Sequence, residues 1–478
     1  MDRFTRTADI IKAYYSYKQT ADSATFVKKV CSFFDFIKDE SLSDADLNLL
    51  LFLANEAGIP QYYDLLKSKF TNAEIGDESI NSLTMSALFH DASLIRGDSK
   101  LHRYQKHVLD SFVATQRNRY VLTAPTSFGK TFLVYEIIQK MQYQNVLLIF
   151  PAISLLSENY ARLCSWEAFS DYAIHSLSEE EFDITQKNIF IFTPERFLSF
   201  MDSHQHLHFN FAFIDEVYKI DNSFVIDQET SGENERDTAY RLALEFICNL
   251  TDNMLLAGPY MALPTAETEL HKSFNDFARD NGFVFLRYNQ FEIVSKEYTT
   301  VKSRQQYIID NIPVEIGSAS KTQKIANIIL ALSSPTENTI IYCNRKSDTE
   351  SYARQLLNNQ ELISIFQERC SAVDAPVYEI FLEHLQNTFG DDWIVLKALK
   401  GRIGIHHSLV PKYIQKEIIS LFNCGALICL FSTTTITEGV NTSAKNIIIT
   451  SGKKGTKNLR QFDAKNIAGR AGRFQQHY

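Results

Sequence analysis

The feature that most constrains the fold is an alternation of short apolar runs with helical stretches between about Leu101 and Val294. The runs that we expect to be buried strands are Tyr120–Leu122, Val146–Phe150, Asn188–Phe192, Phe211–Ile214 and Met254–Ala257. A chain in which such runs alternate with helices is expected to form a parallel sheet covered by helices. This part of the sequence therefore predicts an α/β domain.

A second set of strand-like runs follows further along the chain. These runs are Thr339–Cys343, Ile403–His406, Ala426–Phe431 and Asn446–Thr450. A linker and the helix Lys321–Leu332 precede them, and a helical insertion over about 347–400 separates the first two. Ser347 with Glu350 predicts a capping box at the first helix of that insertion. We therefore expect a second α/β domain.

The first hundred residues predict helices. Ser43 and Asp46 resemble the capping box of a helix that Gly58 and Pro60 end. An earlier helix is marked by apolar residues at helical spacing, namely Phe26, Val27, Val30, Phe33, Phe34 and Ile37. We expect this region to be a packing appendage, and a module that docks a protein partner is the alternative.

Length and composition fit a soluble protein of about three domains. The chain has 478 residues, of which 45% are hydrophobic and 22% are charged. We expect an all-α domain over 1–100, a first α/β domain over 101–297 and a second over 298–478. The longest apolar stretch, Val146–Leu156, is far shorter than the ~20 residues of a membrane helix, so no membrane partner is expected.

The cysteines indicate the redox compartment, and the charge distribution bears on the binding partner. The seven cysteines are scattered and none forms C-x-x-C, which favours a reducing cytoplasm and argues against a metal site built from cysteine. The net charge is −9, yet residues 451–478 carry seven basic side chains against Asp463 alone. Because the distribution of charge matters more than its sum, nucleic acid remains a candidate partner.

The stretch Ala124–Thr131 reads A-P-T-S-F-G-K-T and stands between an expected strand and an expected helix. In that context backbone N–H groups and the positive helix end can cradle phosphates. Lys130 would reach the β- and γ-phosphates, and the Thr131 hydroxyl would bind Mg²⁺. Gly129 would let the backbone approach closely. The residues expected to touch the nucleotide here are Thr126, Ser127, Phe128, Gly129, Lys130 and Thr131.

Two further stretches carry charge suited to phosphoryl transfer. Asp215 and Glu216 close an apolar run, where Asp215 would hold Mg²⁺ and Glu216 would orient the attacking water. The alternative is that the two residues have no catalytic role and form a surface pair at the start of a helix. N-I-A-G-R-A-G-R supplies Arg470 and Arg473, which can stabilise the γ-phosphate from a facing domain, or form only a basic turn. The three motifs in this order predict a motor that hydrolyses a nucleoside triphosphate between two domains.

The chain resembles superfamily 2 helicases, and within them the Ski-like branch, over about residues 100–473. Gln105, in L-H-R-Y-Q-K-H-V-L, matches the upstream glutamine that reads adenine in that family. The other matching motifs are F-P-A-I-S-L-L (150–156), T-P-E-R-F (193–197), I-I-Y-C-N-R-K (340–346), I-H-H-S-L (405–409) and F-S-T-T-T-I-T-E-G-V-N (431–441). T-S-F-G-K-T with D-E-V-Y-K is also similar to the helicase subunits of Hachiman-type anti-phage systems.

The resemblance implies two tandem RecA-like parallel-sheet domains that use ATP and Mg²⁺. It implies that Gly439 and Asn441 link the strand to the nucleotide. Alternatively, His406 has only a structural role, as a packed or capping residue. The residues that would hold nucleic acid are Pro151, Thr193, Arg196, Asn344, Arg345, His406, Ser432, Thr433 and Thr434.

The sequence departs from the family pattern in places that bear on unwinding. Tyr218 takes the fourth place of the D-E-x-H motif, and Gly258–Tyr260 replaces the S-A-T that couples hydrolysis to strand separation. A basic loop over 452–457 predicts a short hairpin where the family splits strands. The chain ends five residues after Arg473, so we expect a shortened or a reduced member of the branch.

The expected function is an ATP-dependent helicase or single-strand translocase. Its substrate would be single-stranded or tailed nucleic acid, with DNA slightly favoured over RNA. The alternative is an ATP-gated scaffold that binds nucleic acid and docks a protein partner, such as a nuclease effector, through residues 1–100 without unwinding. A metabolic kinase would share only the phosphate loop and would leave 431–441 unexplained.

Overall fold

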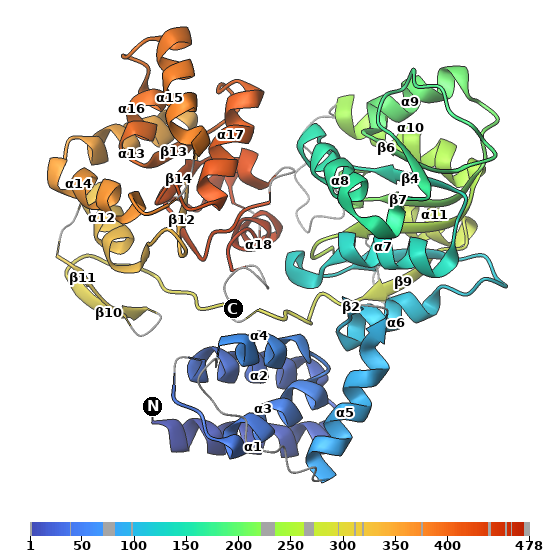
Figure 1. The fold of residues 1–478 in the computed structure, drawn as a ribbon, viewed down its shortest axis with the longest axis horizontal. Coiled ribbons are helices and arrows are strands. Elements are labelled where there is room, and N and C mark those ends of the chain that lie inside the picture. The colour runs from blue at the N-terminus through green and yellow to red at the C-terminus, as the bar shows by residue number, and fades with distance from the viewer. Residues whose placement is uncertain are drawn as a thin grey trace. The chain divides into compact units, whose positions relative to one another are not determined.

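The computed structural model describes residues 2–38, 40–69, 82–96, 99–220, 235–261, 272–294, 296–309, 312–317, 320–373, 376–437, 441–454, 457–459 and 461–472. They form two compact units that divide between Ser295 and Lys296. Each unit contains one parallel sheet with helices around it, and helices precede the first sheet (Figure 1). The predicted α/β fold class with an N-terminal helical region is therefore confirmed.

The first unit begins with helices, drawn in blue in Figure 1. They are α1 Arg3–Thr20, α2 Ser23–Ile37, α3 Asp44–Ala57, α4 Gln61–Lys69 and α5 Ser82–Leu94, followed by the two-residue strands β1 Ile95–Arg96 and β2 Ser99–Lys100. The apolar residues predicted to share one helix all lie on α2 and are buried. Ser43 and Asp46 form the predicted capping box of α3, which ends at Gly58 in a left-handed conformation.

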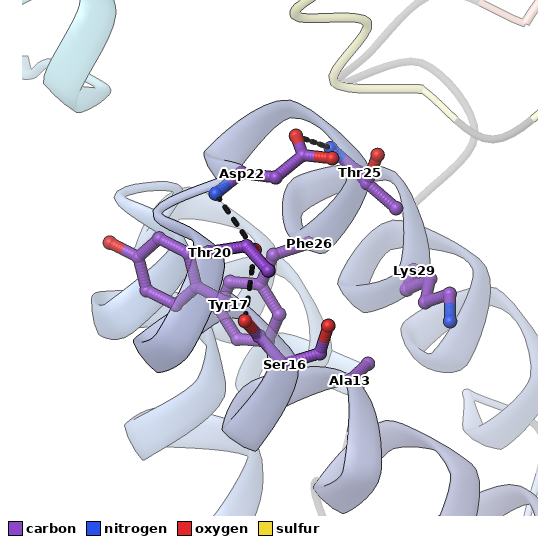
Figure 2. A pocket seen from close by; sticks show the side chains of 8 residues that line it. All are labelled: Ala13, Ser16, Tyr17, Thr20, Asp22, Thr25, Phe26 and Lys29. Carbon is purple, nitrogen blue, oxygen red and sulfur yellow. Dashed lines mark hydrogen bonds between the residues drawn. The ribbon is translucent and has the colours of Figure 1, made fainter.

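A small polar cavity of about 40 Å³ lies where α1 turns into α2 (Figure 2). The side chain of Asp22 accepts a hydrogen bond from Thr25 N at 3.1 Å, and Asp22 N donates to Thr20 Oγ1 at 3.3 Å. These bonds close the turn and cap α2. A cavity of this size holds a water molecule but no nucleotide, so the nucleotide site has to be sought elsewhere.

A seven-stranded parallel sheet forms the centre of the first unit. Its strands are β3 Arg119–Thr123, β4 Asn145–Ile149, β5 Tyr172–His175, β6 Lys187–Phe192, β7 Phe209–Ile214, β8 Thr251–Gly258 and β9 Val284–Arg287, in the spatial order β5-β6-β4-β7-β8-β3-β9. All five predicted strands are present. The two missed strands, β5 and β9, lie at the edges of the sheet and are only partly buried, so their sequences lack a continuous apolar run.

Helices pack against this sheet and bury its apolar side chains. They are α6 Arg103–Ser111, α7 Lys130–Met141, α8 Ile153–Ser165, α9 Pro194–Ser203, α10 Glu235–Leu250 and α11 Lys272–Asp280. Many of the phenylalanines lie in one buried cluster with strands β6 and β7 and helix α9, among them Phe190, Phe192, Phe197, Phe200 and Phe209. Aromatic residues in this unit therefore serve mainly to fill the core.

The second unit is built around a four-stranded parallel sheet in the order β13-β14-β12-β15. The strands are β12 Thr339–Tyr342, β13 Ile403–His406, β14 Cys429–Ser432 and β15 Asn446–Ile449, preceded by the hairpin β10 Gln305–Ile309 and β11 Ile312–Ile316 and followed by the short hairpin β16 Lys453–Lys454 and β17 Lys457–Asn458. The helices are α12 Lys321–Leu332, α13 Lys346–Leu357, α14 Gln360–Cys370, α15 Pro376–Phe389, α16 Ile394–Lys400, α17 Lys412–Asn423 and α18 Gln461–Ala468.

The second unit corrects two predictions and confirms a third. The capping box of Ser347 and Glu350 is wrong, because α13 already begins at Lys346 and its N-cap, Arg345, makes no side-chain cap. The region expected to be a linker contains the hairpin β10–β11. The predicted basic hairpin is present as β16 and β17, which pair antiparallel.

Candidate nucleotide and nucleic-acid site

The chemistry-bearing residues of the first unit follow strands of one parallel sheet at their carboxyl ends. The phosphate loop follows β3, and Asp215 and Glu216 follow β7, with β8 between these two strands. Pro151 follows β4 and Thr193 follows β6. Because all seven strands run in the same direction, these residues share one edge of the sheet. Ligands of open α/β sheets bind at that edge.

The phosphate loop leaves β3, makes a short 3-10 turn at Thr126–Phe128 and enters α7 at Lys130. Gly129 adopts a left-handed conformation with φ of 76°. This φ favours glycine, and a Cβ atom at Gly129 would also stand 2.6 Å from Gln105 Nε2, so the glutamine side chain would have to shift. The loop therefore places the N-terminal amides of α7 at the carboxyl edge of the sheet, as a phosphate site requires.

Two groups in the loop fit a nucleotide phosphate. The Lys130 ammonium donates to the backbone carbonyls of Ala124 at 3.1 Å and Pro125 at 2.9 Å, so it is folded over its own loop. The Ser127 hydroxyl is buried and has no hydrogen-bond partner within the described parts of the chain. A buried hydroxyl without a partner is unfavourable, and a phosphate oxygen would satisfy it. Thr131, the second residue of α7, is half-buried beside them.

Gln105 contacts the phosphate loop directly. Its Nε2 donates to the backbone carbonyl of Phe128 at 3.0 Å, and its Oε1 accepts from His102 N at 3.2 Å. His102 Nε2 contacts the same Phe128 carbonyl at 3.2 Å. Complete burial lowers the pKa of His102 to about 4, so this ring is neutral at physiological pH. Sequence reasoning selected Gln105 but missed His102, whose only signal was its N-cap position before α6.

Asp215 and Glu216 stand where β7 ends, but they have different surroundings. Asp215 is half-buried, and its Oδ1 accepts from Glu216 N at 2.9 Å. The Glu216 carboxylate forms an ion pair with Lys219 at 3.0 Å, and only 7% and 12% of these two side chains are exposed. Glu216 also has a φ of 51°, a left-handed conformation that few residues other than glycine, asparagine and aspartate adopt readily. Such local strain is typical of functional sites.

Thr193 and Arg196 lie at the N-terminus of α9. Thr193 Oγ1 caps this helix by accepting from Arg196 N at 3.4 Å, and Pro194 occupies the first helical position. The Arg196 guanidinium donates to Ser176 O at 3.0 Å. Pro151 is buried. Of this set, the N-terminus of α9 is therefore the feature best suited to a nucleic-acid phosphate.

In the second unit the predicted nucleic-acid residues also follow the carboxyl ends of parallel strands. Asn344 and Arg345 follow β12, and Arg345 is exposed at the start of α13. His406 ends β13, and Ser432 ends the neighbouring strand β14. Thr434, half-buried, begins a short 3-10 turn after β14. These residues therefore share one edge of the four-stranded sheet.

The side chains of His406 and Ser432 face the interior of the second unit. His406 Nδ1 lies 3.2 Å from Ser432 Oγ and 3.1 Å from Thr435 Oγ1, and Thr433 is buried beside them. Burial lowers the pKa of His406 to about 4, with a contribution from Lys412. In this arrangement the hydroxyls of Ser432 and Thr435 hold His406 at the edge of the sheet.

A second histidine contact was missed from the sequence. His407 Nε2 lies 3.2 Å from Glu350 Oε1 of α13, and Leu409 N donates to His407 Nδ1 at 3.3 Å. Burial lowers the pKa of His407 even though Glu350 opposes the shift. Glu350, which the sequence placed in a capping box, therefore lies against His407 instead.

The arginine motif lies at the end of α18. Arg470 is buried, and its carbonyl accepts from Thr442 Oγ1 at 2.5 Å. Asn441 is half-buried, and its carbonyl accepts from Asn423 Nδ2 at 3.0 Å. The predicted site residues Gly439 and Arg473 lie outside the described residues.

The departures from the helicase pattern also have defined positions. Tyr260, in a left-handed conformation with φ of 49°, donates from its hydroxyl to Glu292 Oε1 at 2.9 Å. The carbonyl of Gly258 accepts from Ala124 N at 3.3 Å, so the end of β8 contacts the start of the phosphate loop. Tyr218 packs against the core of the first unit. The segment that replaces S-A-T therefore still contacts the phosphate loop.

Comparison with known proteins supports the same family. Residues 98–249 match the family described as "Type III restriction enzyme, res subunit". The chain is 26% identical over 417 residues to Anti-bacteriophage protein B of Escherichia coli (strain K12), a match that covers 87% of this chain and 50% of that protein. It is 23% identical over 416 residues to Helicase POLQ-like of Homo sapiens, covering 79% of this chain and 34% of that protein.

A shorter match is to Exosome RNA helicase MTR4 of Homo sapiens, 31% identical over 150 residues, which are 28% of this chain and 13% of that protein. These similarities confirm the resemblance to superfamily 2 helicases and to anti-phage defence proteins of this kind. The chain spans half or less of the length of each of these three relatives. Among the helices described, none is long and apolar enough to cross a membrane.

Proposed function

We propose that the protein is an ATP-dependent translocase or helicase that acts on single-stranded or tailed nucleic acid. One observation carries the proposal. A phosphate loop with an unsatisfied buried hydroxyl and the Asp215–Glu216 pair lie at the same carboxyl edge of a seven-stranded parallel sheet. Helicase-named relatives over most of the chain support the nucleic-acid substrate.

In the proposed mechanism Lys130 leaves the loop carbonyls and binds the β- and γ-phosphates. Thr131 and Asp215 would hold Mg²⁺, which supplies positive charge against the phosphates. Nucleotide-bound Mg²⁺ is usually held by one or two protein groups together with phosphate oxygens and water. Glu216 would orient the attacking water, and Arg470 and Arg473 would stabilise charge that develops on the γ-phosphate.

Nucleic acid would bind along both sheet edges through groups that contact its phosphates. The N-terminus of α9 at Thr193, the exposed Arg345 and the basic hairpin β16–β17 are suited to that task. Such contacts read no sequence, and the affinity should fall steeply with salt. We infer a slight preference for DNA over RNA, a cytoplasmic location and a role in antiviral defence, the last supported by the similarity to Anti-bacteriophage protein B.

ATP hydrolysis with single-stranded DNA, duplex DNA or RNA tests the proposal. We expect single-stranded nucleic acid to stimulate the wild type. Lys130→Ala should lose nucleotide binding, whereas Glu216→Gln should bind ATP and fail to hydrolyse it. Lys106→Ala, on the exposed face of α6, is the matched control and should behave as wild type. Wild-type turnover no faster than that of Lys130→Ala would contradict the motor proposal.

A second candidate is an ATP-gated scaffold that binds nucleic acid and docks a protein partner through residues 1–100 without unwinding. The burial of His406 and Ser432, together with the Glu216–Lys219 ion pair, favours this candidate. Displacement of a strand from a tailed duplex would exclude it. ATP-dependent binding of the duplex without displacement would support it over the helicase.

A further inference from the structure

Helix α6 stands between the phosphate loop and the N-terminal helices, and its first residues contact both. On the loop side, His102 and Gln105 both donate to the carbonyl of Phe128, at 3.2 Å and 3.0 Å. The peptide group that joins Phe128 to Gly129 is planar, so its N–H points opposite to its carbonyl. Fixing this carbonyl toward His102 and Gln105 therefore turns the Gly129 N–H away from them.

The hydrogen bonds of His102 determine which of its ring nitrogens carries the proton. Gln105 N donates to His102 Nδ1 at 3.1 Å, so Nδ1 is an acceptor and caps α6. The proton of the neutral ring then resides on Nε2, the atom that faces the Phe128 carbonyl. Nδ1 thus caps helix α6, and Nε2 donates to the Phe128 carbonyl of the loop.

On the other side, Arg103 ties α6 to the end of α3. Its backbone N–H donates to Gly58 O at 2.8 Å, and its guanidinium donates to Glu56 O at 3.2 Å and Asn55 O at 3.0 Å. The last carbonyls of a helix lack partners within it and carry partial negative charge, which suits a guanidinium. A Cβ atom on Gly58 would stand 2.6 Å from Arg103 Cβ, so the close approach requires glycine.

Aromatic contacts stiffen the same connection. The Phe128 ring, buried beneath the loop, packs edge-on against His102 with centroids 4.8 Å apart and lies 5.5 Å from Tyr288. Tyr104 stacks on Phe291 at 4.0 Å. The loop, α6 and the segment after β9 therefore form one packed group.

We propose that His102 is a positioning residue for the phosphate loop. We also propose that Arg103 couples the position of the N-terminal helices to that loop through α6. The N-terminal helices then set the affinity of the loop for nucleotide. This inference rests on the proposed nucleotide site and assigns residues 1–100 a role beyond packing. A partner that pulled α3 away from Arg103 would loosen the loop from a distance.

Two substitutions of His102 separate its two roles. In His102→Asn the amide oxygen takes the place of Nδ1 and keeps the helix cap, but the side chain is too short to reach the Phe128 carbonyl. In His102→Gln the amide nitrogen takes the place of Nε2 and keeps the bond to the loop, while the cap is lost. The measurements are titration of the full chain with a fluorescent ATP analogue in Mg²⁺ and thermal unfolding without nucleotide.

We expect His102→Asn to weaken nucleotide binding about tenfold, the effect of one lost hydrogen bond, with little change in unfolding temperature. His102→Gln should lower the unfolding temperature and keep wild-type affinity. Equal affinities for His102→Asn and wild type, or equal losses in both variants, would overturn the positioning role. If Lys130→Ala also binds as wild type does, the nucleotide site itself is wrong, and that result is distinct from failure of His102 alone.

The link to the N-terminal helices has its own test in Arg103→Met, which keeps the aliphatic packing and removes the guanidinium. We expect nucleotide binding to weaken about threefold or more, because α6 loses its bonds to α3. Lys106→Ala on the same helix is the control and should leave binding unchanged. Wild-type affinity in Arg103→Met would overturn the coupling to the N-terminal helices.

Discussion

At the scale of single residues, Glu216 combines a chemical role with an unfavourable backbone conformation. Its φ of 51° lies in the left-handed region, where the Cβ atom of a residue such as glutamate crowds the backbone and raises the energy. Its carboxylate is also held by Lys219. The residue proposed to orient water is thus kept in place by its surroundings rather than by its own preference.

The strain at Glu216 can be measured with two variants that both remove the carboxylate and its ion pair. Glu216→Gly should be more stable than Glu216→Ala by about 1 kcal/mol, because glycine tolerates positive φ. Urea unfolding of the two proteins gives the difference. Equal stabilities, or a more stable alanine variant, would contradict the left-handed conformation.

The buried histidines predict a loss of stability in acid. Burial lowers the pKa of His102 and of His406 to about 4 in the folded chain, whereas an unfolded histidine titrates near its usual value of 6.5. Between pH 6.5 and 4 the unfolded chain therefore binds protons that the folded chain does not. Each histidine should lower the free energy of unfolding as pH falls through this range, by about 3 kcal/mol in full.

Unfolding measured at several pH values between 7.5 and 4 checks this prediction. His102→Asn removes one titrating group, so the decline between pH 6.5 and 4 should be shallower than in the wild type. Lys106→Ala is the control and should decline as steeply as the wild type. The same slope in His102→Asn and wild type would mean that His102 is not buried in its neutral form.

The loop and the carboxylates could be predicted because their chemistry is local in sequence. Lys130 follows Gly129 directly, and Asp215 ends an apolar run. Contacts that come from other elements could not be predicted, because they join residues far apart in the sequence. His102 reaches the loop across 26 positions of sequence, and His406 meets Ser432 across the same number.

At the scale of elements, experiments can distinguish two roles of Thr193 at the N-terminus of α9. Thr193 caps the helix, and it is also proposed to bind nucleic acid. Thr193→Ala should lower the free energy of unfolding by about 1 kcal/mol and weaken strand binding, whereas Thr193→Ser should preserve both. Urea unfolding and filter binding of single-stranded DNA provide the measurements. Loss of stability in Thr193→Ala with unchanged DNA affinity would leave the threonine as a cap alone.

Periodicity predicted the buried elements well and the exposed ones poorly. Helix α12 and strand β13 match the predicted ranges, because each carries a clear apolar pattern. The edge strand β9 and the hairpin β10–β11 were missed, since these short strands are mostly exposed or half-buried and carry no continuous apolar run. The strand expected over Ala426–Phe431 begins only at Cys429, because the apolar residues before it pack as a loop.

At the scale of the whole molecule, the division at Ser295 predicts that the first unit folds alone. Residues 2–294 contain the complete seven-stranded sheet, including β9 beside β3. A chain that ends at Val294 should unfold cooperatively and still bind the fluorescent ATP analogue. It should not hydrolyse ATP, because both arginines of the motif are absent. Circular dichroism and nucleotide titration check this, and an unfolded or aggregated product would contradict it.

The joint at Arg103 has a consequence for how such proteins can evolve by recombination. An exchange of the first hundred residues between two relatives would separate the end of α3 from the helix that grips it. For the hybrid protein to fold, the incoming segment would need a glycine at position 58. Only then could it pack against the His102–Gln105 segment that the recipient keeps. The N-terminal helices should therefore be inherited with their motor, and lineages that share one should share the other.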